Sequence, residues 1–158
     1  MARWADINAA EPEFASRAQV LFDAHKHKVL ATLRRDGSPR VSGIEVTFAD
    51  GEVWIGSMPE SRKAKDLARD PRLALHCTSD DPPADPTTWS GDAKLSGRAV
   101  VENDRERLKS MSEGGDGSGI LYRIDITEVT ITRVGDPPDH LDVDVWTPAL
   151  GLRRLKAV

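Results

Sequence analysis

The feature that most constrains the fold is a long alternating segment, ILYRIDITEVTITRVG, at residues 120–135. Apolar and polar side chains alternate along it with a period of two, the pattern of a strand with one buried face. It carries more apolar residues than one half-buried strand needs, namely Leu121, Ile124, Ile126, Val129 and Ile131. We therefore expect a β-rich fold with an additional apolar interface along this strand, because exposed apolar patches mark interfaces.

Shorter segments of the same kind precede it and are separated by turn signals. The predicted strands lie within residues 29–48, 49–57, 72–77 and 93–103. The first range is a hairpin with the turn RDGSPR, and Asp50-Gly51 forms the next turn. The last of them is expected to bend at Gly97, since an isolated glycine in a strand often marks a bulge. Antiparallel strands joined by short turns favour a small barrel.

Short helices are predicted around and between these strands. They lie within residues 12–28, 62–69 and 104–111. The first shows apolar residues at helical spacing and has Pro12 near its start. Ser61 is the expected N-cap of the second, which stops at Asp70-Pro71, and Asp104 is the expected N-cap of the third.

The remaining segments are polar or irregular. Residues 78–92 form a long loop rich in proline, residues 112–119 form a glycine-rich loop, and the tail at 140–158 is less regular. We find neither an internal repeat nor a linker, so we expect a single domain over residues 1–158.

Composition narrows the classes of function. The chain has 158 residues, a formal net charge of −4 and a pI of about 5.6, which argues against general binding to nucleic acids or membrane surfaces. Cys77 is the only cysteine, so no internal disulfide can form. The start of the chain lacks the apolar region of a secretion signal, and no window suits a membrane span. We therefore expect a cytoplasmic protein.

One basic stretch, PESRKAKDLARDP at residues 59–71, is a candidate anion site. Arg62 and Lys63 stand at the start of the predicted helix, where free backbone N–H groups and the helix dipole already favour an anion. An arginine fork and a lysine point charge would suit a phosphate. The alternative is an ordinary solvated helix face. That alternative fits Lys65, Asp66 and Arg69 better, because they point away from the apolar stripe of the helix.

Other candidate motifs favour structural roles. GGDGSG at residues 114–119 follows a predicted helix and precedes a strand, the reverse of a dinucleotide-binding loop. Histidine and cysteine side chains outside the basic stretch include His25, His27, His76 and Cys77. None has the spacing of a zinc site, so we expect no metal, and Cys77 is expected to be a small core residue. Trp54 is expected in the core, whereas Trp89 and Trp146 lie in irregular segments and are open to stacking on a ring.

The run from Arg40 to Leu75 resembles the pyridoxamine 5′-phosphate oxidase family of flavin-binding split β-barrels. The resemblance lies in the order RVSGIEV, ADGEV, WIGS, SRKAKDL and DPRLAL, in which SRK opens the helix. It implies a mainly β fold with short helices, a six-stranded antiparallel split β-barrel. It also implies a phosphate-bearing flavin, with FMN favoured, and it makes the phosphate interpretation of Arg62 and Lys63 the preferred one.

The resemblance also implies which residues contact the cofactor. These are Arg40, Val41, Ser42, Gly43, Ile55, Gly56, Ser57, Ser61, Arg62 and Lys63. Arg40, Arg62 and Lys63 would hold the phosphate, and the small residues would let the flavin ring approach the backbone. No general acid or base is nominated, because the flavin carries the hydride chemistry itself.

The sequence departs from the family pattern at several positions. Asp92 stands where the family has a glutamine, and Glu45 where the oxidases have a lysine. The oxidases have a C-terminal segment with a tryptophan and arginines, and only Trp146, Arg153 and Arg154 resemble it here. The chain is also similar to short enzymes that use the deazaflavin coenzyme, and VLATLRRDGSPRVSGI is close to their first hairpin.

Three function classes remain open from the sequence. The favoured one is an FMN- or deazaflavin-dependent oxidoreductase that acts on a small-molecule substrate, with the cofactor at a homodimer interface as the family implies. The second is a non-catalytic flavin or haem carrier of the same fold. The third, nucleic-acid binding through residues 62–72, is opposed by the net charge and by Asp66 and Asp70. Substrate contacts are expected from the 78–92 loop and the tail.

Overall fold

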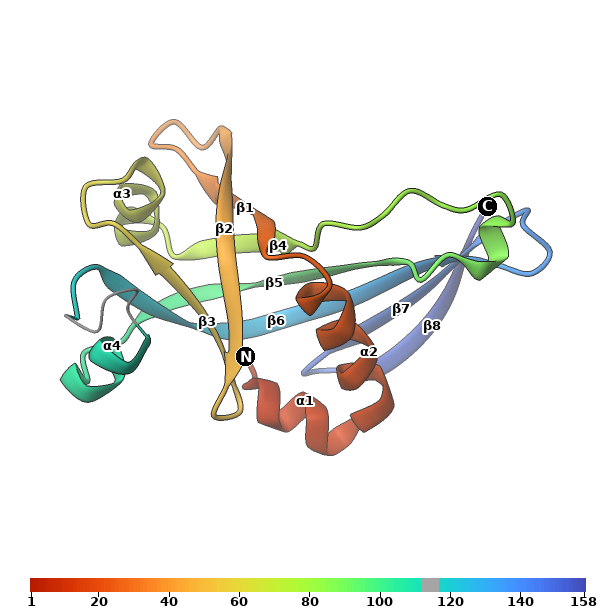
Figure 1. Cartoon of the computed structure of the whole chain (residues 1–158), viewed down its shortest axis with the longest axis horizontal. Helices are drawn as coiled ribbons and strands as arrows, with labels where there is room; N and C mark the ends of the chain where they lie inside the picture. The colour runs from red at the N-terminus through yellow and green to blue at the C-terminus, as the bar shows by residue number, and fades with distance from the viewer. Residues whose placement is uncertain (112–116) are drawn as a thin grey trace.

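A computed structural model of the chain describes residues 1–111 and 117–158 (Figure 1). The helices are α1 (Trp4–Ala10), α2 (Pro12–Asp23), α3 (Arg62–Arg69) and α4 (Arg105–Met111), with a short 3₁₀ turn at Pro86–Thr88. The strands are β1 (His27–Leu33), β2 (Pro39–Ala49), β3 (Glu52–Ser57), β4 (Arg72–His76), β5 (Asp92–Val101), β6 (Ile120–Val134), β7 (Leu141–Thr147) and β8 (Gly151–Ala157).

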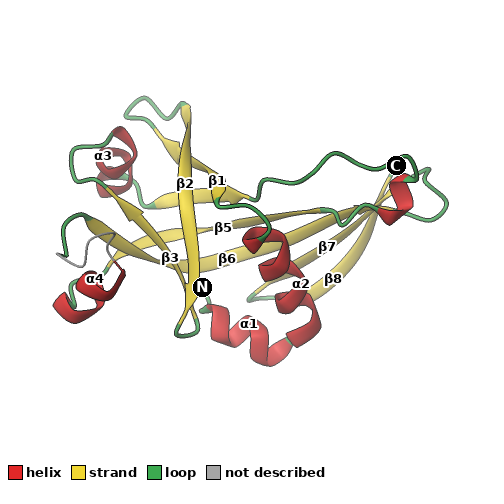
Figure 2. Cartoon of the chain, viewed as in Figure 1, coloured by secondary structure: helices red, strands yellow, loops and turns green. Residues whose placement is uncertain are grey.

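Six strands close into an antiparallel barrel, as the sequence predicted. The strand order is β3-β2-β1-β4-β5-β6, and an additional pairing of β3 with β6 closes the ring. β7 and β8 extend the sheet beyond β6, so the barrel carries two extra strands. Figure 2 shows α3 and α4 at one end of the molecule and β7 and β8 extending towards the other.

The predicted bend in β5 is confirmed. The register between β5 and β6 shifts between Ser96 and Gly97, which is a β-bulge. A Cβ at Gly97 would lie 2.5 Å from the carbonyl oxygen of Asp125 and 2.7 Å from Cγ2 of Ile124. Glycine is therefore required here by close packing of β5 on β6, and the bulge lets the long strands curve around the core.

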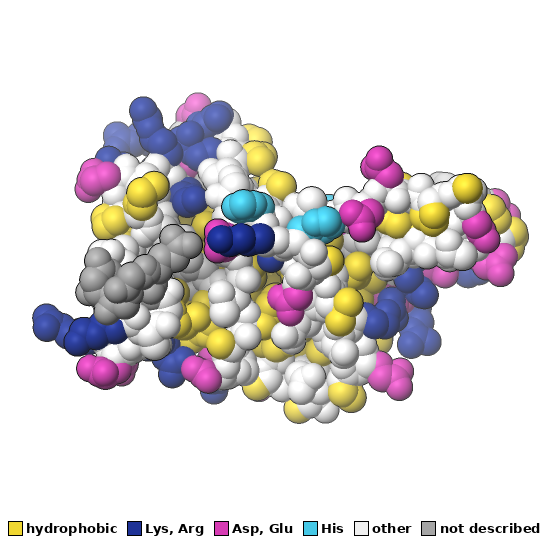
Figure 3. All heavy atoms as spheres, viewed as in Figure 1, with side chains coloured by type: hydrophobic (Ala, Val, Ile, Leu, Met, Phe, Trp, Pro, Cys, Tyr) yellow, Lys and Arg dark blue, Asp and Glu magenta, His cyan; other side chains and the backbone are white. Residues whose placement is uncertain are grey.

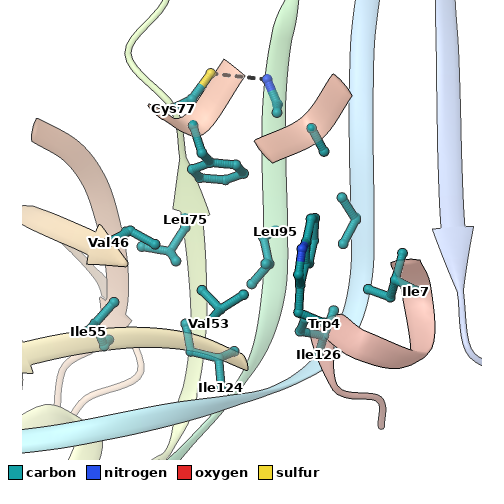
Figure 4. Close-up of a cluster of buried hydrophobic side chains, with 14 of the residues drawn as sticks. Trp4, Ile7, Val46, Val53, Ile55, Leu75, Cys77, Leu95, Ile124 and Ile126 are labelled. Carbon is teal, nitrogen blue, oxygen red and sulfur yellow. Dashed lines mark hydrogen bonds between the residues drawn. The ribbon is translucent and has the colours of Figure 1, made fainter. Parts of the chain in front are cut away.

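The barrel core is formed by alternate residues of the strands. Figure 4 shows Val46, Val53, Ile55, Leu75 and Leu95 converging with Ile124 and Ile126 of β6. Trp54 and Cys77 are buried as predicted, and Cys77 Sγ accepts a hydrogen bond of 3.1 Å from the backbone N–H of Ala93. Burial raises the pKa of the Cys77 thiol, so it stays protonated and unreactive at neutral pH.

The apolar residues of β6 do not face a separate interface. Leu121, Ile124, Ile126, Val129 and Ile131 are all buried within the chain's own core. The expectation of an exposed apolar patch along β6 is therefore wrong. The strand is more apolar than a half-buried strand because it packs against the barrel interior and, beyond the bulge, against the N-terminal helices.

Two segments of regular structure were not predicted. α1 covers the barrel next to β3, and Ala2 forms an isolated bridge with Ile126, exchanging two backbone hydrogen bonds of 2.9 Å. The tail expected to be irregular forms the hairpin of β7 and β8. Trp146, expected in an irregular segment and open to stacking, is buried in β7 against β6.

The local signals at the helices are largely confirmed. α2 has Pro12 in its first turn but ends at Asp23, so the predicted helix is too long by the HKHK segment, whose last two residues, His27 and Lys28, begin β1. The backbone N–H of Arg107 donates to Asp104 Oδ1 over 2.9 Å, as expected for the N-cap of α4. In the GGDGSG segment, residues 114–116 lie outside the described part of the chain. No helix of the described residues is long and apolar enough to cross a membrane.

Candidate functional site

The residues predicted to contact a cofactor lie around the point where β2 and β3 separate. β2 pairs with β3 from Val46 to Ala49, opposite Glu52–Ile55. Beyond this point β3 continues along β6 through Gly56 and Ser57, whereas the Arg40–Gly43 segment of β2 stays paired with β1. The segment after β3 then turns into α3.

The N-terminus of α3 brings four of the predicted residues together. Ser61 is the N-cap, and its Oγ accepts a 3.2 Å hydrogen bond from the backbone N–H of Ala64. The hydroxyls of Ser57 and Ser61 share a hydrogen bond of 2.7 Å. Lys63 Nζ donates to the carbonyl oxygen of Gly43 over 3.0 Å, which ties the helix to β2. We call this group, with Arg62, the α3 anion site.

Among the described residues, no carboxylate neutralises the two cations of the α3 anion site. Arg62 is exposed and forms neither a hydrogen bond nor an ion pair with any described residue. Lys63 bonds only the neutral carbonyl of Gly43 within the same described part of the chain. Both charges therefore remain available to an anion that also meets the helix N-terminus. Figure 3 shows basic side chains gathered over α3 and the turn between β1 and β2.

Arg40 occupies a different environment from Arg62 and Lys63. Its Nε donates to Asp66 Oδ2 over 2.6 Å, and its side chain is only 20% exposed. Asp66 also accepts hydrogen bonds from Thr32 Oγ1 at 2.9 Å and from Arg69 Nη2 at 3.1 Å. Arg40 is thus held against α3 by Nε, while its two terminal amino groups bond no described residue.

Asp66 is a buried hub and not part of a solvated face. Its side chain is 5% exposed, so the expectation that Asp66 points to solvent is wrong. Burial by itself would raise the pKa of Asp66, but the hydrogen bonds from Arg40, Arg69 and Thr32 outweigh it and hold the pKa below 3.8. Asp66 therefore stays ionised and connects α3 to β1 and β2. The one sequence signal for it was Thr32, a polar residue at a core-facing position.

The glycines of the site face open space. A Cβ added at Gly43 or at Gly56 would have no atom within 4 Å. Val41 is 69% exposed, and Ser42 is half-buried. Ile55, by contrast, directs its side chain into the barrel core (Figure 4). Only its backbone is left to contact a ligand.

Residues on the outer face of the barrel continue the site away from α3. Val41 and Gly43 of β2 pair with Ala31 and Val29 of β1, and these two residues pair in turn with Ala74 and His76 of β4. A hollow of about 200 Å³ opens on this face and reaches across β5 to β6. The hollow is lined mainly by apolar atoms of β1 and β4 and by polar side chains of β5 and β6.

The positions that depart from the family pattern are distributed unevenly. Glu45 follows Gly43 on the outer face of β2 and forms an ion pair of 3.2 Å with Lys26. Asp92 lies at the start of β5, 3.5 Å from His76 Nε2. Arg153 and Arg154 lie on β8, at the far end of the sheet from α3 (Figure 1). Within one chain, they are not brought to the α3 anion site.

The remaining candidates are engaged elsewhere. His25 Nε2 lies 3.2 Å from Asp80 Oδ1, and His27 Nε2 lies 3.8 Å from Glu45 Oε1. Trp89, expected to be free for stacking, donates from its indole N–H to the carbonyl of Asp80 over 2.8 Å within the 78–92 loop. These contacts give no common centre for the histidines.

Comparison with known proteins assigns the family. The family model for pyridoxamine 5′-phosphate oxidase matches residues 15–133, which is most of the chain and includes the whole α3 anion site. The chain belongs to the pyridoxamine 5′-phosphate oxidase family. Among curated proteins, none matches the sequence.

Solved structures share the fold over nearly the whole chain. A pyridoxamine 5′-phosphate oxidase-related, FMN-binding protein from Nostoc punctiforme is 13% identical and covers 100% of this chain and 98% of its own, with a TM-score of 0.64. PhzG from Burkholderia lata, in complex with tetrahydrophenazine-1-carboxylic acid, is 13% identical. It covers 96% of this chain and 91% of its own, with a TM-score of 0.65. A conserved hypothetical protein from Mycobacterium tuberculosis is 23% identical, covers 82% and 88%, and has a TM-score of 0.60. At these identities the likeness establishes the fold alone.

Proposed function

We propose that this protein is an oxidoreductase that binds a phosphate-bearing flavin, with FMN as the favoured cofactor and the deazaflavin coenzyme as the alternative. The observation that carries the proposal is the α3 anion site. Two cations that pair with no carboxylate of the described residues stand at a capped helix N-terminus, beside two hydroxyls. The membership of the chain in the family and the FMN-binding relative support the same cofactor.

The phosphate would be held by Arg62, Lys63 and the N-terminus of α3. Arginine offers a planar fork for two phosphate oxygens, and lysine adds a point charge. Arg40, fixed through its Nε by Asp66, would add its terminal amino groups from the side of β2. The Asp66 hydrogen bonds would orient this arginine before the ligand arrives, which lowers the entropy lost on binding.

The flavin ring would lie over the outer face of β2. Gly43 leaves room for close approach to the backbone, and the apolar hollow beyond it suits an aromatic ring. When bound, the flavin supplies the hydride chemistry. The residues of this chain bind it, orient it and exclude water from one of its faces.

The proposal is tested by titrating the purified protein with FMN, FAD, the deazaflavin coenzyme and haem. A ligand present at 100 times its dissociation constant adds about 2.7 kcal/mol to the free energy of unfolding, which a thermal shift resolves. The absorption spectrum distinguishes the bound species. Failure of every flavin to bind more tightly than about 1 mM, or about −4 kcal/mol, would contradict the proposal.

The enzymatic part of the proposal needs a separate measurement. The bound flavin should be reduced by a nicotinamide or deazaflavin donor and reoxidised by a substrate, both of which are followed by absorbance. A flavin that binds tightly but exchanges no electrons with any donor or acceptor would instead identify a non-catalytic carrier.

We also propose that the protein is a homodimer and that the outer face of β1, β2 and β4 forms the interface. Val29 is 40% exposed and Val41 is 69% exposed on this face, and both border the hollow or the α3 anion site. A partner seated here would cover these side chains and close the flavin site from outside. This replaces the sequence-based argument from β6, whose apolar residues belong to the core.

Sedimentation of a matched pair of variants tests the interface. Val41→Asp should shift the protein to a monomer at micromolar concentration. Val20→Asp changes a valine of similar exposure, 66%, on α2, and should leave the dimer intact. A wild-type monomer in the presence of bound cofactor would contradict the dimer.

A further inference from the structure

A second charged cavity lies far from the α3 anion site, between α2 and the hairpin of β7 and β8. Its volume is about 370 Å³, within the range of small-molecule sites, roughly 300–1,000 Å³. The cavity is lined by the basic residues Arg17, Arg133, Arg154 and Lys156 and by the acidic residues Asp142 and Asp144. Figure 3 shows basic side chains grouped over β8, beside α2.

The acidic residues of this cavity neutralise only part of its charge. Asp144 is buried, and it contacts Arg17 Nη1 at 3.2 Å and Arg154 Nε at 3.9 Å. Asp142 lies 4.0 Å from Arg133 Nη2. Four basic groups against two carboxylates leave two positive charges in excess. This excess stands out because the whole chain has a net charge of −4.

One donor of the cavity has no acceptor. The Nη2 atom of Arg17 is buried and makes no hydrogen bond within the described part of the chain. Its Nη1 atom is fixed on Asp144, so the guanidinium cannot turn Nη2 towards another acceptor without losing that bond. A buried donor of this kind is costly unless a ligand satisfies it.

We infer that this cavity binds a small organic oxyanion with at least two negative charges, such as a phosphomonoester or a di- or tricarboxylate. Arg17, whose side chain is 41% exposed, would present its guanidinium group to the anion, and Arg154 and Lys156 would balance the remaining charge. The size of the cavity exceeds that of a single ion. The cavity lies at β7 and β8, which extend away from the end of the molecule that holds α3 (Figure 1), so it is separate from the proposed phosphate site for the flavin.

Two-dimensional NMR of the ¹⁵N-labelled full chain tests this inference. Inorganic phosphate and citrate are titrated separately at constant ionic strength, so that the phosphate and carboxylate sources are distinguished. We expect saturable shifts in α2, β7 and β8, including the side-chain Nε–H signals of Arg17 and Arg154. Lys156→Gln should weaken binding by about tenfold, as expected for the loss of one charge-assisted contact. Lys156 is exposed on an edge strand, so this variant should fold normally.

Two controls locate the binding. Lys65→Gln removes the same charge from an exposed position on α3 and should leave the affinity unchanged. Arg62→Ala with Lys63→Ala removes the α3 anion site, so signals in β7 and β8 should still shift with the same affinity. The inference would be overturned by any of three results: shifts that do not saturate, an affinity in Lys156→Gln equal to that of the wild type, or shifts that disappear in the double variant. Because the double variant reports on the other site, failure here would leave the proposed flavin function standing.

Discussion

The two turns of α3 carry the same kind of charge but use it differently. In the first turn, Arg62 and Lys63 meet no carboxylate among the described residues. In the second turn, Arg69 lies 3.1 Å from the buried Asp66, which also holds Arg40 of β2. One helix therefore contains a cation pair open to a ligand in its first turn and, in its second turn, a buried carboxylate that pairs with Arg69 and with Arg40 of β2.

This contrast separates binding from folding. A buried carboxylate that is paired and fully hydrogen-bonded holds neighbouring elements in place. Removing one partner leaves the other charged groups without their counter-charge. Cations without a protein partner contribute little to folding, because exposed charges are solvated and screened. The first turn should therefore control cofactor affinity, and the second turn should control stability.

The largest effect is expected from removal of the first-turn cations. Arg62→Ala with Lys63→Ala should raise the dissociation constant for FMN by about two to four orders of magnitude, since each charge-assisted bond to phosphate contributes roughly 1.5–3 kcal/mol. The melting temperature of the protein without cofactor should change by only a few degrees. Fluorescence titration and thermal unfolding measure the two quantities. An unchanged affinity would show that the phosphate is not bound here.

The next largest effect is expected at Asp66. Asp66→Asn should lower the free energy of unfolding by about 2–4 kcal/mol, because Arg40 and Arg69 lose their buried counter-charge. Urea unfolding at neutral pH measures this change. FMN affinity should fall by a smaller factor than in the first-turn variant, since only the position of Arg40 is disturbed. Equal loss of affinity with no loss of stability would contradict the division of α3 into two functions.

The same substitution should change the response to acid. The pKa of Asp66 is lowered below 3.8 in the folded protein, so its contribution to stability is present above the pKa of the unfolded chain. That contribution is lost as the pH falls from about 4 through the lower folded pKa. The wild-type protein should therefore lose its stability advantage over Asp66→Asn as the pH falls below about 4 and passes through the lowered folded-state pKa of Asp66. Unfolding midpoints of both proteins across this range measure the convergence.

The local structure of the first turn of α3 could be predicted from the sequence, whereas the contacts of Asp66 in the second turn could not. The signals at Ser61, Arg62 and Asp70 are local, because an N-cap, a basic first turn and an Asp-Pro stop all lie within a few residues. Asp66 depends on Arg40 and Thr32, which are 26 and 34 residues away on two strands. Helical spacing alone placed Asp66 on the solvent side.

The β7–β8 hairpin was missed for a similar reason. In LDVDVWT, aspartates alternate with valines, and aspartate is unfavourable in strands, so the segment gives a weak strand signal. Asp144 is nevertheless buried in β7 because Arg17 of α2 lies against it, 127 residues away in the sequence. The six barrel strands were predicted because apolar and polar residues alternate within each of them and turn residues lie next to them, so each signal is local in the sequence.

A pair of glycine variants sharpens the comparison between open and packed regions. Gly97→Ala should destabilise the protein by about 1–3 kcal/mol, because its Cβ would lie 2.5 Å from the Asp125 carbonyl oxygen. The Cβ added by Gly43→Ala would have no atom within 4 Å, so this variant should change stability by less than about 1 kcal/mol. FMN affinity should respond in the opposite order, with about a tenfold loss for Gly43→Ala, equivalent to 1.4 kcal/mol. Normal FMN binding by Gly43→Ala would exclude close contact of the ring with β2.

The smallest effects are expected beyond the first turn, where Lys65 and Arg69 differ in one respect. Lys65 is exposed and lies 2.8 Å from Glu60, a carboxylate that is still more exposed, so Lys65→Ala should change neither the urea midpoint nor the affinity for FMN measurably. Arg69 donates to Asp66 and also to the carbonyl oxygen of Leu33, which ties the end of α3 to β1. Arg69→Ala should therefore lower the urea midpoint while leaving FMN affinity close to that of the wild type. If Lys65→Ala and Arg69→Ala both weakened FMN binding as strongly as the first-turn variant, the cations of α3 would act as a diffuse positive surface. Phosphate recognition would then not depend on the helix N-terminus.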